Sequence, residues 1–232
     1  MEQKKNKKPI FKRWWFWGII ILIIFIAAGS GGNKGGTKNN VVQKPGTQKS
    51  ISTPLKKEKE RQVSGKSVDL GAGTFTGGKD VSEGLYDVTP VAGQGNFVIK
   101  SSKGELVINE ILGSSMGLGV LKVRTKISND DQVQIQGISK VHFEPVTSPF
   151  VKSVQTVNLY SGRWTVGEDI AQGRYKAQAS SGSGNFIISK NGFPVTNEII
   201  GESGVKDVTV NLSDGEIMQI TNLNQVTLTP VK

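Results

Sequence analysis

The chain contains two copies of one sequence, and this internal repeat constrains its fold more than any other feature. At a constant offset of 89 residues, 11 of the 27 residues in 73–99 are identical to those in 162–188. The similarity continues after a one-residue slip, through Asn109-Glu110-Ile111 and Asn197-Glu198-Ile199, and it ends near residues 146 and 231. The repeat indicates two copies of one folded unit, joined near residues 147–156.

Each copy has the pattern of an all-β fold. Short runs with β-branched or alternating apolar residues are separated by Gly, Asn, Asp and Ser clusters, and no stretch of 67–232 has sustained helical periodicity. The predicted strands are 86–89, 96–100, 105–109, 120–125, 132–136, 174–177, 185–188, 208–212, 216–220 and 225–229. We expect two tandem small β-sandwich or barrel-like modules, module 1 at 67–147 and module 2 at 157–232.

Both copies share a short motif with a known group of proteins. Residues 166–175 spell V-G-x-D-I-x-x-G-x-Y, and residues 77–86 match except that Gly77 replaces the first Val and Val81 replaces the Ile. This motif resembles an uncharacterised all-β module of extracytoplasmic proteins from Gram-positive bacteria. The resemblance covers roughly 70–146 and 159–231. It implies an exported β module and no particular activity.

The excess positive charge lies outside the predicted modules. The whole chain has a net charge of +10, but residues 67–232 hold fourteen basic and sixteen acidic residues. A nucleic-acid-binding domain needs its basic patch on the folded surface, where it neutralises phosphates. We therefore expect no nucleic-acid partner.

Residues 14–32 have the pattern of a transmembrane segment. A basic block, 1–13, precedes an uncharged run that opens with Trp14, Trp15 and Trp17, as in an aromatic belt at a membrane interface. The charge bias predicts a single-pass protein of the cell membrane, with a cytoplasmic N-terminus and extracellular modules. The alternative is a cleaved secretory signal, because Ala27-Ala28-Gly29 offers small residues for cleavage. We favour the uncleaved signal anchor because the tryptophans suit a permanent interface.

The segment 33–66 is predicted to be a disordered basic linker. It is rich in Gly, Ser, Asn, Thr and Lys and has too few apolar residues to form a core. Two interpretations remain open. The linker either passes through an anionic layer, such as a cell-wall polymer or lipid headgroups, or is a spacer that its charges keep extended.

Composition excludes much catalytic chemistry. The chain has no Cys and one His, so thiol nucleophiles and thiolate or imidazole metal cages are excluded or nearly so. Oxygen ligands for calcium recur in both copies, as Asp80/Asp169, Asn96/Asn185 and Glu110/Glu198. Asp and Asn also form turns by bonding to their own backbone. Because repeated Asp and Gly in a repeated fold are first of all repeated turns, we favour turns.

Two further motifs are partial matches to catalytic or phosphate-binding loops. Gly113-Ser-Ser115-Met-Gly117 has the spelling of a nucleophile elbow, and Asp130 or Asp131 and then His142 follow in hydrolase order. No helix-forming stretch follows the serine, and the second copy lacks its spacing. Gly73–Asp80 resembles a phosphate loop with Asp80 in place of the required hydroxyl. We expect neither to be a site and expect His142 to be structural or at the surface.

Aromatic residues could instead line a carbohydrate-binding surface. Phe75/Trp164, Tyr86/Tyr175 and Phe97/Phe186 occupy equivalent positions in the two copies, which favours a role in the core. That leaves few other rings, namely Phe143, Phe150, Tyr160 and Phe193.

The sequence therefore predicts a membrane-tethered surface protein with a non-enzymatic binding or envelope-structural role. We assign no catalytic, cofactor-binding or metal-ligating residue and no cofactor, and the ligand and protein partner are not identified. The alternative is a secreted or anchored hydrolase, or a calcium-binding protein, that acts at the cell envelope.

Overall fold

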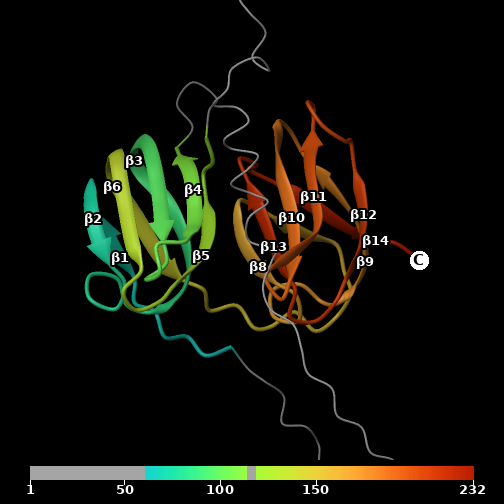
Figure 1. Ribbon diagram of the computed structural model, residues 1–232, viewed down its shortest axis with the longest axis horizontal. Coiled ribbons are helices and arrows are strands. Elements are labelled where there is room, and N and C mark those ends of the chain that lie inside the picture. The colour runs from blue at the N-terminus through green and yellow to red at the C-terminus, as the bar shows by residue number, and fades with distance from the viewer. Residues whose placement is uncertain (1–60, 114–118) are drawn as a thin grey trace, which may run out of the picture. The chain divides into compact units, whose positions relative to one another are not determined.

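The computed structural model describes residues 61–113 and 119–232, and all regular structure in them is β-strand (Figure 1). This confirms the predicted all-β class. Because they contain no helix, these residues have no helical span long and apolar enough to cross a bilayer. The strands are β1 Val68–Leu70, β2 Gly73–Thr76, β3 Gly84–Lys100, β4 Leu106–Leu112, β5 Val123–Ile127, β6 Gln132–Pro145, β7 Val157–Leu159, β8 Gly162–Thr165, β9 Gly173–Ala179, β10 Ser183–Lys190, β11 Phe193–Gly201, β12 Val208–Leu212, β13 Ile217–Thr221 and β14 Val226–Pro230.

Two long strands organise the first half of the described chain. β3 has 17 residues and β6 has 14, and they pair antiparallel along most of their length. The register shifts near Gly93 (φ 92°), which is paired with Ile138, the residue after Gly137 (φ 79°); both glycines have a left-handed conformation that glycine adopts without strain. β3 then pairs with β5 near its start and with β4 near its end, while β6 pairs with β2 and β1 in the same way.

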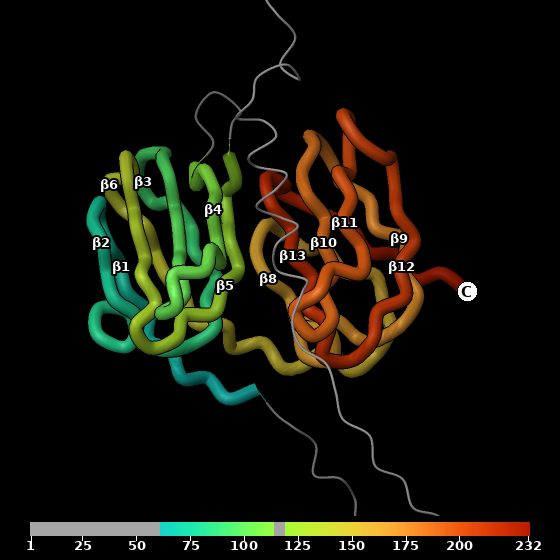
Figure 2. Tube along the Cα trace, viewed as in Figure 1, coloured from blue at the N-terminus to red at the C-terminus, as the bar shows by residue number. Residues whose placement is uncertain are grey.

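The second half uses separate strands for the same path. β9 and β10 take the places of the two ends of β3, and β13 and β14 take those of β6 (Figure 2). β12 pairs with β9, β11 with β10, β8 with β13 and β7 with β14. Asn222 (φ 59°) separates β13 from β14 at the position of Gly137.

The buried apolar side chains form two clusters, one in each half. Tyr86, Phe97 and Phe143 belong to the first. The Phe143 ring makes edge-to-face contacts with the other two, with its centroid 6.0 Å from that of Tyr86 and 5.9 Å from that of Phe97. Trp164, Tyr175 and Phe186 belong to the second. Both clusters lie within one unit of the chain, Lys56–Lys232. A parallel contact between β5 and β8 joins strands of both halves into one ten-stranded sheet.

Every one of the ten predicted strand segments overlaps an observed strand. The sequence did not predict β1, β2, β7, β8 or β11. The first four have only three or four residues, and β11 contains Pro194 and Asn197, which are unusual in strands. The basic block 1–13, the predicted anchor 14–32, the linker as far as residue 60 and Ser115 lie outside the described residues.

Candidate functional site

The repeated motif forms the same turn in both halves. The carboxylate Oδ2 of Asp80 accepts the Thr76 N–H at 2.8 Å, and that of Asp169 accepts the Thr165 N–H at 2.8 Å. At the end of the motif, the Tyr86 hydroxyl donates to the Ser82 carbonyl at 2.9 Å and the Tyr175 hydroxyl to that of Ala171 at 3.0 Å. Both aspartates therefore shape turns, as the sequence predicts.

The two aspartates differ in what their second oxygen contacts. Asp80 is exposed, whereas Asp169 is buried. Oδ1 of Asp169 accepts hydrogen bonds from Arg61 Nη2 at 2.7 Å and from Arg124 Nη1 at 3.1 Å. Asp169 thus ties a residue that precedes module 1 and a residue of β5 to module 2.

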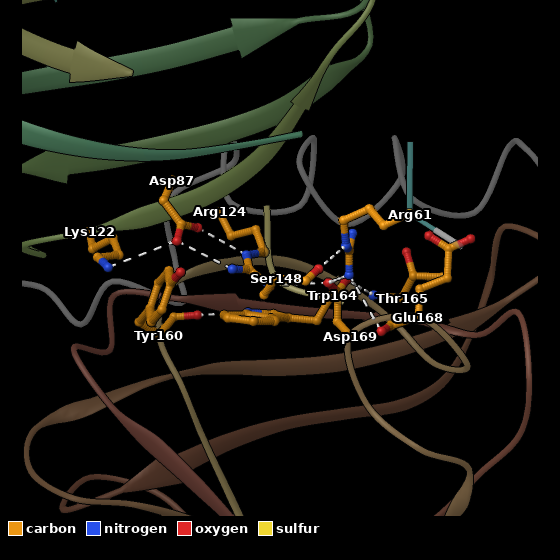
Figure 3. A network of polar contacts seen from close by, with 10 residues as sticks. All are labelled: Arg61, Asp87, Lys122, Arg124, Ser148, Tyr160, Trp164, Thr165, Glu168 and Asp169. Atoms are coloured by element: carbon orange, nitrogen blue, oxygen red, sulfur yellow. Dashed lines mark hydrogen bonds and ion pairs between the residues drawn. The ribbon is translucent and has the colours of Figure 1, made fainter. Parts of the chain in front are cut away.

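Arg124 is the centre of this polar network (Figure 3). Its Nε and Nη2 donate to the two carboxylate oxygens of Asp87 at 2.9 and 3.2 Å, while Nη1 bonds to Asp169. Two-point binding of this kind fixes the plane of the guanidinium as well as its position. Asp87, Arg124, Asp169 and Arg61 form a chain of alternating charge, most of it buried.

Two aromatic rings of module 2 cover the cations. The guanidinium carbon of Arg124 lies 4.1 Å from the centre of the Trp164 ring, and Lys122 Nζ lies 4.8 Å from that of Tyr160. The Trp164 indole N–H donates to the Tyr160 carbonyl at 2.9 Å. Cations over aromatic faces are attracted by the ring quadrupole, so these contacts add to the ion pairs.

The ionisation of the network follows from its surroundings. Burial acts to lower the pKa of Arg124, but its hydrogen bonds to Asp87 together with the charges of Asp87, Tyr160 and Asp169 outweigh that effect, and the net shift is upward. Burial raises the pKa of Tyr160. Arg124 is therefore a permanent cation and Tyr160 a neutral phenol at physiological pH.

Backbone bonds join the halves beside this network. The Arg124 N–H donates to the Ser161 carbonyl at 2.9 Å, and Arg124 is paired with Gly162 in the parallel contact of β5 and β8. Asn224 accepts the Leu121 N–H at 2.8 Å and donates to the Gly119 carbonyl at 3.2 Å. We call this set of contacts between β4–β5 and module 2 the junction.

Glu110 of β4 completes the junction. Its side chain is buried, and its two carboxylate oxygens each lie 3.2 Å from the backbone nitrogen of Asn222, the turn residue between β13 and β14. Burial raises the pKa of Glu110 to about 7, against hydrogen bonds that lower it. This carboxyl group therefore changes charge near neutral pH.

A cleft of about 560 Å³ lies next to the junction. Its lining includes Arg61, Phe150, Lys126, Arg163, Glu105 and Glu168. Arg61 lies over the Phe150 ring, 4.8 Å from its centre, and donates to the Ser148 carbonyl at 2.8 Å. Charged groups of both signs beside an aromatic ring suit a polar ligand.

The residues considered for hydrolase chemistry do not come together. His142 is bonded through Nδ1 to Asp69 at 2.6 Å and through Nε2 to Glu144 at 3.1 Å, on the surface of β6. The hydrogen bond to the Asp69 carboxylate raises the pKa of His142. Asp131 instead accepts the Ser128 N–H at 2.8 Å, and Asp130 occupies a turn at φ 63°.

The residues considered as metal, phosphate or sugar ligands have other roles. The described chain contains no group of three or more His, Asp or Glu placed to hold a metal. Asn185 donates to Thr221 at 3.1 Å. The phosphate-loop spelling at 73–80 is strand β2 and its turn, with no helix after it.

Most of the aromatic residues considered for sugar binding belong to the core or the junction. The repeated rings are buried or half-buried, and Phe143 is buried with them. Phe150 lines the cleft and Tyr160 belongs to the junction. Phe193, at 69% exposure, is the remaining ring of this set and lies on the surface.

From the sequence alone, Asp87, Arg124 and Arg61 were not identified as members of a network, although all three are charged residues. Arg124 and Asp87 have no like residue in the second copy, where Thr209 and Lys176 stand. That difference between otherwise similar repeats was the available signal.

No protein family model matches the chain, and no curated protein is similar to it.

Proposed function

We propose that the chain is a membrane-tethered extracytoplasmic protein in which two tandem β modules, 67–147 and 157–232, are presented on a stalk. Its role is non-enzymatic, in binding or in the structure of the cell envelope. The N-terminal segment fixes its position, the linker sets its reach, and the modules meet a partner through the cleft beside the junction.

The contacts of Arg61 carry this proposal. Arg61 is the first described residue and lies near the end of the linker 33–66; its guanidinium binds Ser148 and Asp169, which follow module 1 in the sequence. The side chain is almost fully buried, at 8% exposure. The end of the stalk is thus attached to the junction and not to one module alone. Such an attachment supports a stalk whose last residues lead to the junction and its cleft.

The cleft offers groups for a polar partner. Lys126 and Arg163 line it and form no ion pair with another residue of the described chain. Val107 and Ile217 provide apolar wall between them. A site of this kind binds and orients a ligand through hydrogen bonds and charge.

The topology of the chain tests the proposal. The full chain carries one tag at each terminus, and intact cells are treated with a protease before the membranes are isolated. We expect loss of the C-terminal tag while the N-terminal tag stays with the membrane in a small fragment. A C-terminal tag that survives on intact cells and is lost only after lysis overturns the proposal.

The same experiment separates the anchor from a cleaved signal. A retained anchor keeps both tags on one membrane-bound polypeptide before protease treatment. If the signal is cleaved, the C-terminal tag appears in the medium without the N-terminal tag.

A further inference from the structure

The junction occupies strand edges that are left open at the equivalent places of the repeat. β5 pairs with β3 and β8, and β8 pairs with β13 and β5. The repeat counterpart of β5 is β12, and that of β8 is β2. Within the described chain, β12 pairs only with β9 and β2 only with β6. Each therefore has one edge without a strand partner, and such edges are templates for pairing with another chain.

Burial shows the same asymmetry on the β8 side. Ser161, Gly162 and Trp164 are buried in the junction. Their counterparts in module 1 are Ala72 and Gly73, both exposed, and Phe75, which is half-buried. A surface covered by a neighbouring module in one repeat is thus uncovered in the other.

Burial differs in the same way on the β5 side. Glu110 and Arg124 are 5% and 8% exposed, whereas the counterparts Glu198 and Thr209 are exposed. Beside them, Ile199 and Val205 are 53% and 43% exposed on the outermost part of module 2. The open edge therefore carries apolar surface as well as unpaired backbone.

We propose that a second copy of this chain covers these surfaces, with β12 of one copy pairing in parallel with β2 of the next. The contact repeats between copies the pairing that β5 and β8 make within one copy. Because the two surfaces differ, the association is head-to-tail and each added copy leaves a new open edge.

The charges at the two open edges are complementary. Lys176 stands at the position of Asp87, and Asp80 stands at the position of Asp169. In the junction, Arg124 is the cation between the carboxylates of Asp87 and Asp169. In the contact between copies, Thr209 stands in place of Arg124 and has no charge. Lys176 then supplies the cation that pairs with Asp80. Opposite charges across an interface favour this orientation over others.

The turn contact is also retained. Glu198 has the position of Glu110, and Gly137 has that of Asn222. Gly137 and Asn222 have similar left-handed backbone conformations, with φ of 79° and 59°. A carboxylate on β11 of one copy therefore meets the same type of turn on the next copy.

Gly73→Ala tests the pairing directly. Gly73 is the counterpart of Gly162, where an added Cβ would lie 2.1 Å from the Arg124 carbonyl oxygen. Within one copy, the nearest contact of a Cβ at Gly73 is the Phe75 ring, at 3.1 Å. The substitution therefore blocks the contact with Thr209 of the next copy and leaves the fold of the single copy in place.

The full-length natural chain and Gly73→Ala are reconstituted in phosphatidylcholine vesicles and treated with a zero-length crosslinker. We expect a ladder of dimers, trimers and larger species for the natural chain on a denaturing gel, and loss of that ladder for Gly73→Ala. The control Ser102→Ala, on an exposed turn, should keep the ladder. A ladder that is absent for the natural chain, or equal for Gly73→Ala, overturns the proposal.

Two further measurements test the same contact. In an equimolar mixture of ¹⁴N- and ¹⁵N-labelled natural chains, zero-length crosslinking should yield Lys176–Asp80 peptides of mixed label; their absence overturns the proposal even where a variant fails to fold. Thr209→Pro removes the outward N–H that corresponds to that of Arg124, and should weaken self-association at least about tenfold. The control Thr209→Val keeps that N–H and should associate normally. These outcomes do not depend on which side of a membrane the modules occupy.

Discussion

At the scale of single residues, Arg124 should matter most for stability. Its guanidinium binds Asp87 and Asp169 and lies under Trp164. Replacing Arg124 by Ala removes the cation that neutralises these carboxylates. The loss of one partner from a comparable buried pair lowers the free energy of unfolding by about 3 kcal/mol. We expect Arg124→Ala to lower the free energy of unfolding by that amount in denaturant titrations.

Arg163→Ala is the matched control for this substitution. Arg163 lines the cleft and forms no ion pair with a described residue, so its loss should change the free energy of unfolding by less than about 0.5 kcal/mol. Equal effects of the two substitutions would contradict a central role for Arg124.

Glu110 should make stability depend on pH. Its pKa in the folded protein is about 7, above the ordinary value of 4.5. Between these two values the folded state holds a proton that the unfolded chain has released, so stability falls as the pH rises through this interval. The full loss above pH 7 is about 3 kcal/mol.

Glu110→Gln should remove this dependence. The amide oxygen can still accept the Asn222 N–H, and no charge forms at high pH. We expect the variant to be more stable than the natural chain at pH 8 and to have a flatter profile between pH 4.5 and 7. Glu198→Gln, at the exposed equivalent position, should leave the profile of dilute protein unchanged. Parallel profiles for the natural chain and Glu110→Gln would refute the assignment.

At the scale of elements, the two copies of the turn should respond differently to the same substitution. Asp80 makes one turn bond at the surface, so Asp80→Ala should cost about 1 kcal/mol. Asp169 makes the same bond and also binds Arg61 and Arg124. Asp169→Ala should therefore cost about 3 kcal/mol in the same denaturant titration. Similar costs at both positions would show that the ion pairs add nothing to the turn.

The turns and most of the longer strands were predictable because their causes are local, whereas β11 was missed. Alternating apolar residues and flanking Gly and Asn fix segments such as Val208–Leu212 without reference to the rest of the chain. β8 was not predictable, because four residues are too few to show an alternating pattern; they form a strand by pairing with β13. Glu110 was visible as a repeated acid, but its contact with Asn222 depends on how the two halves meet.

At the scale of the whole molecule, the similarity between the two copies carries no information about the junction. Conserved positions such as Tyr86 and Tyr175 report the fold that the copies share. The residues of the network are those in which the copies differ, such as Arg124 against Thr209. The sequence therefore predicts the modules from similarity, whereas their attachment depends on asymmetry that only the three-dimensional contacts explain.

This attachment should make the two modules unfold together. Gly162 lies where β8 meets β5, at φ 129°, and a Cβ there would be 2.1 Å from the Arg124 carbonyl oxygen. Gly162→Ala must therefore push β8 away from β5, whereas Gly73→Ala, at the equivalent open edge, meets only a ring that can move. In calorimetry of the dilute full chain we expect one transition for the natural protein and for Gly73→Ala. Gly162→Ala should show two transitions and faster proteolysis between the modules at 147–156. Two transitions in the natural protein would mean that the junction does not couple the modules, since their two cores would then melt independently despite the shared sheet.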